Sequence, residues 1–182
     1  MIPISAIPNT LTVLRIILAP LVCIGACNGL YAWSVCAFWF ASVSDFFDGY
    51  LARRLRCQSF FGRVADPVAD KLLTLCAYIP MRADFPYLFW LVILRDVSIL
   101  VGVGVLHFCH IKCEIVPSTI SKVNTGFTLL LPFIWLCLKC CHINGRALLE
   151  GLAAIVMVTT VCSAWGYART FTKTLRSHRA PD

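Results

Sequence analysis

The sequence predicts an all-α integral membrane protein with six transmembrane helices, and two observations lead to this fold class. Of the 182 residues, 59% are apolar and only 14% are charged, a composition far from that of soluble domains of this size. The apolar residues also gather in runs of about 20, the length of α-helix that crosses the hydrocarbon core of a bilayer.

Polar and helix-breaking residues separate the apolar runs. The predicted spans cover residues 10–28, 31–53, 61–81, 86–108, 118–138 and 146–168. In order, the first five end at Asn28-Gly29, at the basic run from Arg53 to Arg63, at the turn around Asp84, at the polar stretch that contains Pro117, and at Asn144-Gly145. Glycine, proline and clustered polar residues at these points favour helix ends and turns.

A single membrane domain over residues 1–182 is expected, because no low-complexity stretch or clear internal repeat divides the chain. The N-terminus lacks the basic region and the small-residue cleavage site of a secretory signal. Pro8-Asn9 leads directly into the first span instead.

Lysine and arginine concentrate on one side of the predicted membrane. The second and fourth loops and the C-terminal tail hold Arg53, Arg54, Arg56, Arg63, Lys112, Lys122, Arg169, Lys173, Arg176 and Arg179. The opposite side holds Arg82, Lys139 and Arg146. By the positive-inside rule, both termini are cytoplasmic. The net charge of +7 therefore indicates topology and attraction to anionic lipid headgroups, and not nucleic-acid binding.

Four aspartates lie toward the cytoplasmic ends of the second and third spans: Asp45, Asp48, Asp66 and Asp70. Ionisable residues inside a span are functional candidates. On helices, the first pair is three residues apart and the second pair four, so each pair shares a face. A short connection makes the two helices antiparallel neighbours. Four like charges then come together and need a positive partner.

Hard divalent cations fit this set, because no His or Cys lies among the carboxylates and Mg2+ and Mn2+ prefer oxygen ligands. We expect two ions about 4 Å apart, as in other phosphoryl-transfer enzymes. Gly49 and Ala52 on the same face leave room for a nucleotide or its pyrophosphate. Arg53 offers a planar fork for phosphate, and Gly62 permits a tight turn or a close backbone approach.

Together these residues fill the pattern D-x2-D-G-x2-A-R-x8-G-x3-D-x3-D without a gap. Taken singly, each has a structural explanation, since an Asp can pair with a nearby Arg and small residues often serve helix packing. A chance occurrence of the whole pattern is on the order of one in 10^8. The pattern resembles the signature of the CDP-alcohol phosphatidyltransferases.

The resemblance covers most of the chain. IPNTLTVLRIILAP is similar to the first helix of bacterial phosphatidylglycerophosphate synthases and of cardiolipin synthases of the mitochondrial type, and FFDGYLARR and ADPVADKLL suit both. ILRDVSIL and PSTISKVNT are more similar to the cardiolipin synthases. The Leu-Arg-Glu stretch of many phosphatidylglycerophosphate synthases is not evident.

This resemblance implies a six-helix, usually dimeric enzyme that transfers a phosphatidyl group from CDP-diacylglycerol to a hydroxyl and releases CMP, in anionic phospholipid biosynthesis. The four aspartates would bind the divalent ions, and Asp70 would also be the base that removes the acceptor proton. The residues against the cytidine diphosphate would be Asp48, Gly49, Ala52, Arg53 and Gly62. The expected acceptor is phosphatidylglycerol, which gives cardiolipin, with glycerol 3-phosphate as the alternative. A bacterial inner membrane is the expected location, with the active site cytoplasmic.

Two further polar positions have two interpretations each. Arg95 in the fourth span either binds the phosphate of the acceptor or forms an internal ion pair with Asp96. Lys122 at the start of the fifth span either binds the same phosphate or is a lysine that snorkels to the interface beside a helix cap. Similarly, Thr12 and Arg15 either extend the polar surface or belong to the capping of the first helix.

A cation transporter or channel is the alternative from another functional class. Its polar groups would lie at successive depths, whereas the four aspartates cluster at one end. A catalytically silent scaffold is disfavoured, because every position of the pattern is intact. The 11 cysteines do not indicate one metal site, since a helix of about 36 Å separates the cluster at Cys109 from that at Cys137. A redox pair of Cys137 and Cys140 on the outer side stays open.

Overall fold

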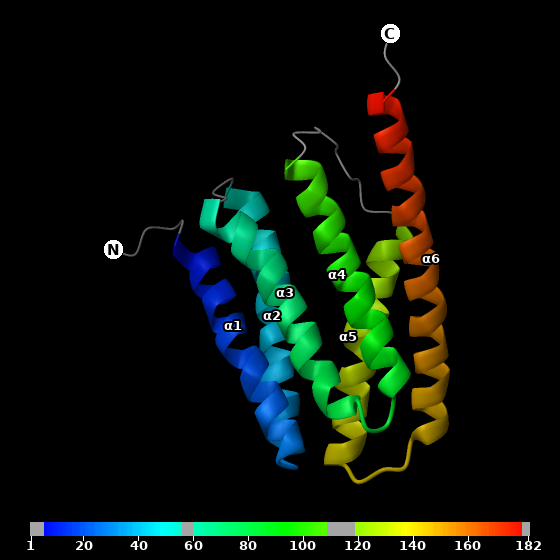
Figure 1. Cartoon of the computed structure of the whole chain (residues 1–182). Helices are drawn as coiled ribbons and strands as arrows, with labels where there is room; N and C mark the ends of the chain where they lie inside the picture. The colour runs from blue at the N-terminus through cyan, green and yellow to red at the C-terminus, as the bar shows by residue number, and fades with distance from the viewer. Residues whose placement is uncertain (1–5, 56–59, 109–118, 180–182) are drawn as a thin grey trace. The chain divides into compact units, whose positions relative to one another are not determined.

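The structure of the protein is a computed structural model that describes the backbone of residues 6–55, 60–108 and 119–179 (Figure 1). It describes the side chains of residues 10, 12–45, 68–101, 119–169 and 172.

In these segments, every regular element is an α-helix (Figure 1). The helices are α1 (Ala6–Cys27), α2 (Tyr31–Leu55), α3 (Phe60–Met81), α4 (Pro86–Phe108), α5 (Thr119–Cys140) and α6 (Arg146–Arg179). The predicted all-α class is therefore confirmed, and each predicted span lies on one helix. The last predicted span, 146–168, agrees with the apolar segment Arg146–Arg169, and the helix that carries it continues to Arg179.

Two described helical segments are long and apolar enough to cross a membrane, Thr119–Cys140 and Arg146–Arg169. A shorter apolar segment, Thr12–Cys27, lies in α1. Of the remaining helices, α2, α3 and α4 each contain charged residues within their apolar runs. The membrane character of the chain is thus supported, whereas the count of six spans stays a prediction.

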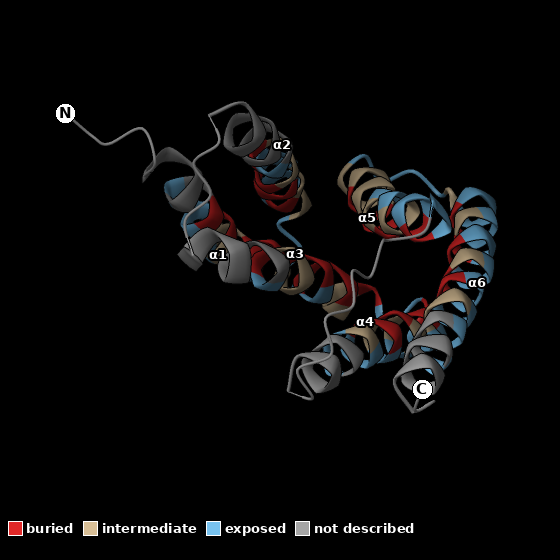
Figure 2. Ribbon diagram, turned by 90° about the horizontal axis from the view of Figure 1, so that it is seen from above, coloured by how far each residue is buried: buried red, intermediate tan, exposed pale blue. Residues whose placement is uncertain are grey.

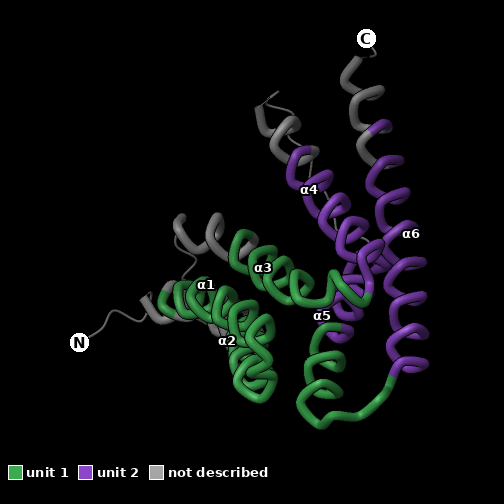
Figure 3. Tube along the Cα trace, turned by 60° about the horizontal axis from the view of Figure 1, so that its bottom comes forward, with its two compact units in different colours: residues 1–84, 132–145 green, residues 85–131, 146–182 purple. Residues whose placement is uncertain are grey.

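The chain forms two compact units, shown in different colours in Figure 3. Unit 1 comprises Met1–Asp84 and Pro132–Gly145, and unit 2 comprises Phe85–Leu131 and Arg146–Asp182. Unit 1 therefore holds α1, α2, α3 and the C-terminal part of α5, and unit 2 holds α4, the rest of α5 and α6. The single membrane domain remains a prediction.

Unit 1 is organised around α1, which contacts both α2 and α3; Figure 2 shows the three helices as neighbours, with buried residues in red. The buried residues of α1 recur every three or four positions and so form one stripe: Thr12, Arg15, Ala19, Val22 and Ala26. The first two are polar and the rest are apolar. The stripe therefore changes from polar to apolar along the helix.

The apolar end of α1 packs closely against the start of α2. The hydroxyl of Ser34 donates to the carbonyl of Val22 at 3.1 Å. A Cβ at Gly25 would lie 2.5 Å from the same hydroxyl oxygen and 3.1 Å from the ring of Trp33, so a larger residue would require these side chains to move.

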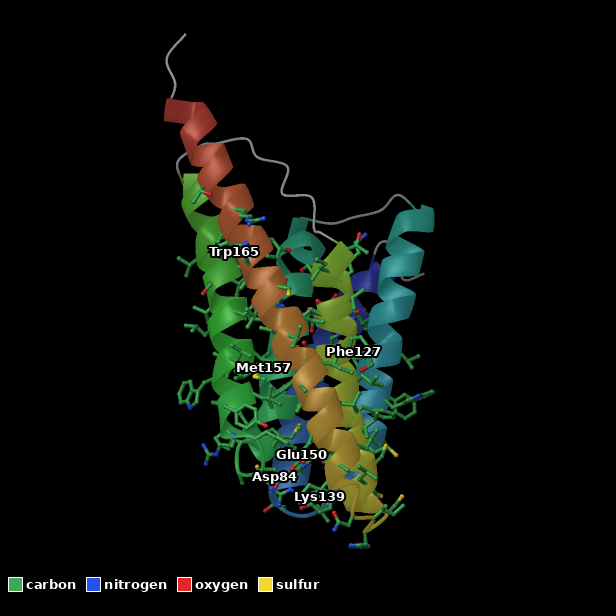
Figure 4. The ribbon with its side chains drawn as sticks, turned by 90° about the vertical axis from the view of Figure 1, so that its right-hand side faces the viewer. Asp84, Phe127, Lys139, Glu150, Met157 and Trp165 are labelled. Carbon is green, nitrogen blue, oxygen red and sulfur yellow. The ribbon has the colours of Figure 1, made fainter. Side chains whose placement is uncertain are left out.

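A second group of contacts in unit 1 lies beyond the end of α3. The indole nitrogen Nε1 of Trp135 donates to Oδ2 of Asp84 at 2.7 Å, and Nζ of Lys139 lies 3.4 Å from that oxygen. Lys139 also lies over the ring of Trp135, and Tyr31 meets that ring edge-on. Figure 4 labels Asp84 and Lys139. These contacts attach the C-terminal part of α5 to α2 and to the turn that follows α3.

Candidate active site

The four aspartates of the pattern lie on two helices of unit 1. Asp45 and Asp48 belong to the second half of α2, and Asp66 and Asp70 to the first half of α3. Both segments are helical, so the spacings of three and four residues place each pair on one helix face. The side chains of Asp48, Gly49, Ala52, Arg53, Gly62 and Asp66 lie outside the described residues.

Asp45 is held by a residue that the pattern does not contain. Nη1 of Arg15 lies 2.8 Å from Oδ1 of Asp45. The arginine side chain is 1% exposed, whereas that of Asp45 is 53% exposed. Arg15 lies well inside α1, so it does not cap that helix. The ion pair joins α1 to the part of α2 that carries the pattern.

Asp70 is partly buried on α3. Its neighbours Ala69 and Leu73 are buried, and the hydroxyl of Thr74 donates to the carbonyl of Asp70 at 3.1 Å. The backbone around Asp70 is therefore regular helix, packed on one side.

The chemistry of the donor set fits a hard divalent cation. Asp45 and Asp70 both offer carboxylate oxygens, from two helices that each contact α1. The exposure of Asp45 leaves its carboxylate accessible from solvent. Among the described side chains, no group of three or more His, Cys, Asp or Glu is placed to hold a metal ion. The two-ion site, which also needs Asp48 and Asp66, thus stays a prediction.

Arg95 lies at the centre of a polar cluster in unit 2. Its Nη1 donates to Oδ1 of the adjacent Asp96 at 2.7 Å, and its Nη2 donates to the hydroxyls of Ser121 at 3.0 Å and Ser163 at 3.1 Å. The hydroxyl of Tyr167 is 3.2 Å from that of Ser121. Arg95 and Asp96 are both buried. The internal ion pair is therefore present within α4, and the hydrogen bonds of Arg95 to the two serines link α4 to α5 and α6.

The polar contacts continue one turn along α5. Oδ1 of the buried Asn124 accepts hydrogen bonds from Thr159 at 2.8 Å and Thr160 at 2.9 Å. Sequence reasoning missed these partners, although the three-residue spacing of Ser121 and Asn124 was a usable signal of one polar helix face. Lys122, between them in sequence, is exposed.

The cysteines add no site to this description. Cys137 and Cys140 are free thiols, and Cys109 lies outside the described residues.

Comparison with known proteins decides the family. The sequence profile of the CDP-alcohol phosphatidyltransferases matches residues 5–165. The chain belongs to the CDP-alcohol phosphatidyltransferase family. The resemblance inferred from the eight-residue pattern is thereby confirmed.

Named relatives fall into two groups. The chain is 30% identical to the "Probable cardiolipin synthase (CMP-forming)" of Drosophila melanogaster, over 90% of this chain and 57% of the relative. It is 29% identical to the human "Cardiolipin synthase (CMP-forming)", over 93% of this chain and 63% of the relative. It is also 29% identical to the "CDP-diacylglycerol--glycerol-3-phosphate 3-phosphatidyltransferase" of Aquifex aeolicus, over 87% of this chain and 91% of the relative. The chain thus spans less than two thirds of the fly and human proteins.

The family to which the chain belongs consists of transferases of phosphate-containing groups. The family uses CDP-diacylglycerol with an alcohol acceptor and generally depends on divalent cations. Its members are membrane enzymes, which agrees with the two helical segments able to cross a bilayer.

Proposed function

We propose that this protein transfers a phosphatidyl group from CDP-diacylglycerol to a hydroxyl acceptor and releases CMP. The observation that carries the proposal is the complete eight-residue pattern, in a chain that matches the family over residues 5–165. The half-exposed carboxylate of Asp45, held by Arg15, supports the proposal from the structure.

In the proposed reaction, the acceptor oxygen forms a bond to the phosphorus that carries diacylglycerol, and the bond from that phosphorus to the CMP oxygen breaks. Asp70 takes the proton of the acceptor hydroxyl. Asp48, Gly49, Ala52, Arg53 and Gly62 lie against the cytidine diphosphate, and Arg53 binds its phosphate. Asp45, Asp48, Asp66 and Asp70 hold two Mg2+ or Mn2+ ions. When bound, these ions supply positive charge to the pyrophosphate and to the leaving CMP.

The proposed acceptor is phosphatidylglycerol, with cardiolipin as product. The segments ILRDVSIL and PSTISKVNT, together with the fly and human relatives, support this choice. Glycerol 3-phosphate is the second candidate, because the Aquifex relative is named for it and is covered over 91% of its length. Of the two residues predicted to bind the acceptor phosphate, Lys122 is exposed, whereas Arg95 is buried and bonded to three side chains. Lys122 is therefore the residue that we propose binds the phosphate of the acceptor.

The proposed setting is a bacterial inner membrane, crossed six times by a homodimer whose termini and active sites are cytoplasmic. The distribution of lysine and arginine supports this orientation. A soluble nucleotide head could then reach the aspartates while the acyl chains of both lipids stay in the bilayer.

The test is a product assay on the purified protein in detergent, with labelled CDP-diacylglycerol and Mg2+ or Mn2+. Phosphatidylglycerol and glycerol 3-phosphate are offered separately, and both CMP and the lipid product are measured. Cardiolipin would support the preferred acceptor, and phosphatidylglycerophosphate the second candidate. If neither acceptor releases CMP, nor inositol or serine in their place, the transferase proposal is wrong and cation transport becomes the function to test.

A further inference from the structure

Arg15 is a buried charge that the proposed reaction does not use. It lies in α1, outside the eight-residue pattern, and it is the largest of the fully buried side chains in the described part of the chain. An arginine stays protonated under all physiological conditions, so its burial is costly unless an anion neutralises it. The presence of Arg15 at this position therefore needs a reason.

Among the described side chains, Asp45 is an anion that pairs with it, across the contact between α1 and α2. The two exposures differ, since the guanidinium is enclosed and the carboxylate reaches the surface. The arginine thus approaches Asp45 from the interior. It engages Oδ1 at 2.8 Å, and a carboxylate has a second oxygen that can bind another cation.

We propose that Arg15 is a positioning residue for the divalent-cation site. It fixes the Asp45 carboxylate through Oδ1, so that Oδ2 is presented to a metal ion. This inference rests on the proposed function, because it assumes that Asp45 is a metal ligand. Hydrogen-bonded partners of metal ligands orient them, and loss of such a partner typically weakens metal binding by about 10- to 100-fold.

A purely electrostatic role makes the opposite prediction. A positive charge next to the carboxylates repels an incoming cation, so removal of Arg15 would then tighten metal binding. The direction of the change in metal affinity therefore separates positioning from charge repulsion.

The experiment measures Mn2+ binding to the purified full-length protein in detergent, from the loss of the electron paramagnetic resonance signal of free Mn2+. The variants are Arg15→Met and Arg15→Lys, with Arg82→Met as a matched control because Arg82 is exposed in the turn after α3. Thermal unfolding of the metal-free protein is followed in parallel.

We expect Arg15→Met to weaken Mn2+ binding by about 10- to 100-fold. Arg15→Lys should restore part of that loss, because it keeps a charged donor but lacks the planar fork. Arg82→Met should bind as the wild type does. Unchanged or tighter binding by a folded Arg15→Met protein would overturn the positioning role.

If Arg15→Met does not fold, Arg15→Lys decides the question, since it keeps the charge but lacks the planar fork that holds the carboxylate in one orientation. Weaker Mn2+ binding supports positioning, and unchanged or tighter binding overturns it. An absence of Mn2+ binding by the wild type would contradict the metal site itself and, with it, this role of Arg15. Normal wild-type binding that the Arg15 variants do not weaken contradicts the role of Arg15 alone.

Discussion

Among the described side chains, each unit buries one arginine, and the two arginines are neutralised in different ways. In unit 1, Arg15 pairs with a carboxylate of another helix, Asp45, which is half exposed. In unit 2, Arg95 pairs with its own neighbour Asp96 and with two serines, and both charged residues are buried. A buried arginine bonded to serines of other helices links those helices, whereas a carboxylate held from the interior and open to solvent can also bind a ligand. We therefore expect unit 1 to carry the reaction chemistry and Arg95 mainly to stabilise unit 2.

The largest effect expected in unit 1 is on turnover. Asp70→Asn should lower kcat by about 10^2- to 10^4-fold, because an amide cannot accept the acceptor proton. CMP release in the detergent assay measures this, and metal and nucleotide binding should persist in weakened form. Asp84→Asn is the matched control, since it is the same substitution away from the pattern and keeps an acceptor oxygen for Trp135. Near-normal activity of Asp70→Asn would show that Asp70 is not the base.

The corresponding test in unit 2 is on stability. Arg95→Met should lower the free energy of unfolding by about 3–5 kcal/mol, because it leaves Asp96 buried without its cation. Denaturant titration in detergent gives this value, with Arg82→Met as the exposed control. If Arg95→Met is as stable as the wild type but has a higher KM for the acceptor, Arg95 binds the acceptor and does not mainly stabilise unit 2.

Lys122 tests whether unit 2 also contributes to substrate binding. Lys122→Met should raise the KM for the acceptor by about tenfold, because loss of a charge-assisted hydrogen bond to phosphate costs roughly 1.5 kcal/mol. The KM for CDP-diacylglycerol should change little. Lys139→Met, near the other end of α5, is the control. Equal changes in both KM values would exclude a specific acceptor role.

The smallest effect should come from the serines around Arg95. Ser163→Ala removes one of its hydrogen bonds and should cost about 1–2 kcal/mol in unfolding free energy, with kcat unchanged. Comparison of its unfolding curve with that of Ser98→Ala, whose hydroxyl is exposed and bonds only within α4, isolates the contact between helices. Equal stability of the two variants would mean that the Arg95 cluster is not a stabilising contact.

Local features of the sequence were sufficient to place the helices. Pro86 and Asn144-Gly145 mark helix boundaries that the structure reproduces, because glycine and proline act on the backbone directly. Hydropathy predicted the apolar span within α6 and not the end of the helix, because a helix in water continues until a backbone signal stops it. No glycine or proline occurs between Gly166 and Pro181.

The candidate site was only partly accessible to sequence reasoning. The aspartate pattern is local to two helices, so its spacing alone indicates shared faces. The pairs that hold the residues in place join distant positions, such as Trp135 with Asp84 and Arg95 with Ser163. Periodicity along one helix carries no information on such partners, and only the packing of the helices reveals them.

The ion pair of Arg15 and Asp45 also has a consequence for biosynthesis, because it joins two helices that follow one another along the chain. Arg15 lies five residues inside the predicted span 10–28, and a charge there opposes insertion of a lone helix by less than the roughly 2.5–3.5 kcal/mol of a central arginine on translocon-based scales. We expect α1 and α2 to enter the membrane together as a hairpin, with Asp45→Asn reducing the inserted fraction in a glycosylation-mapping experiment. Asp45, the proposed metal ligand, would then have an earlier role, in which it neutralises Arg15 while the two helices enter the membrane.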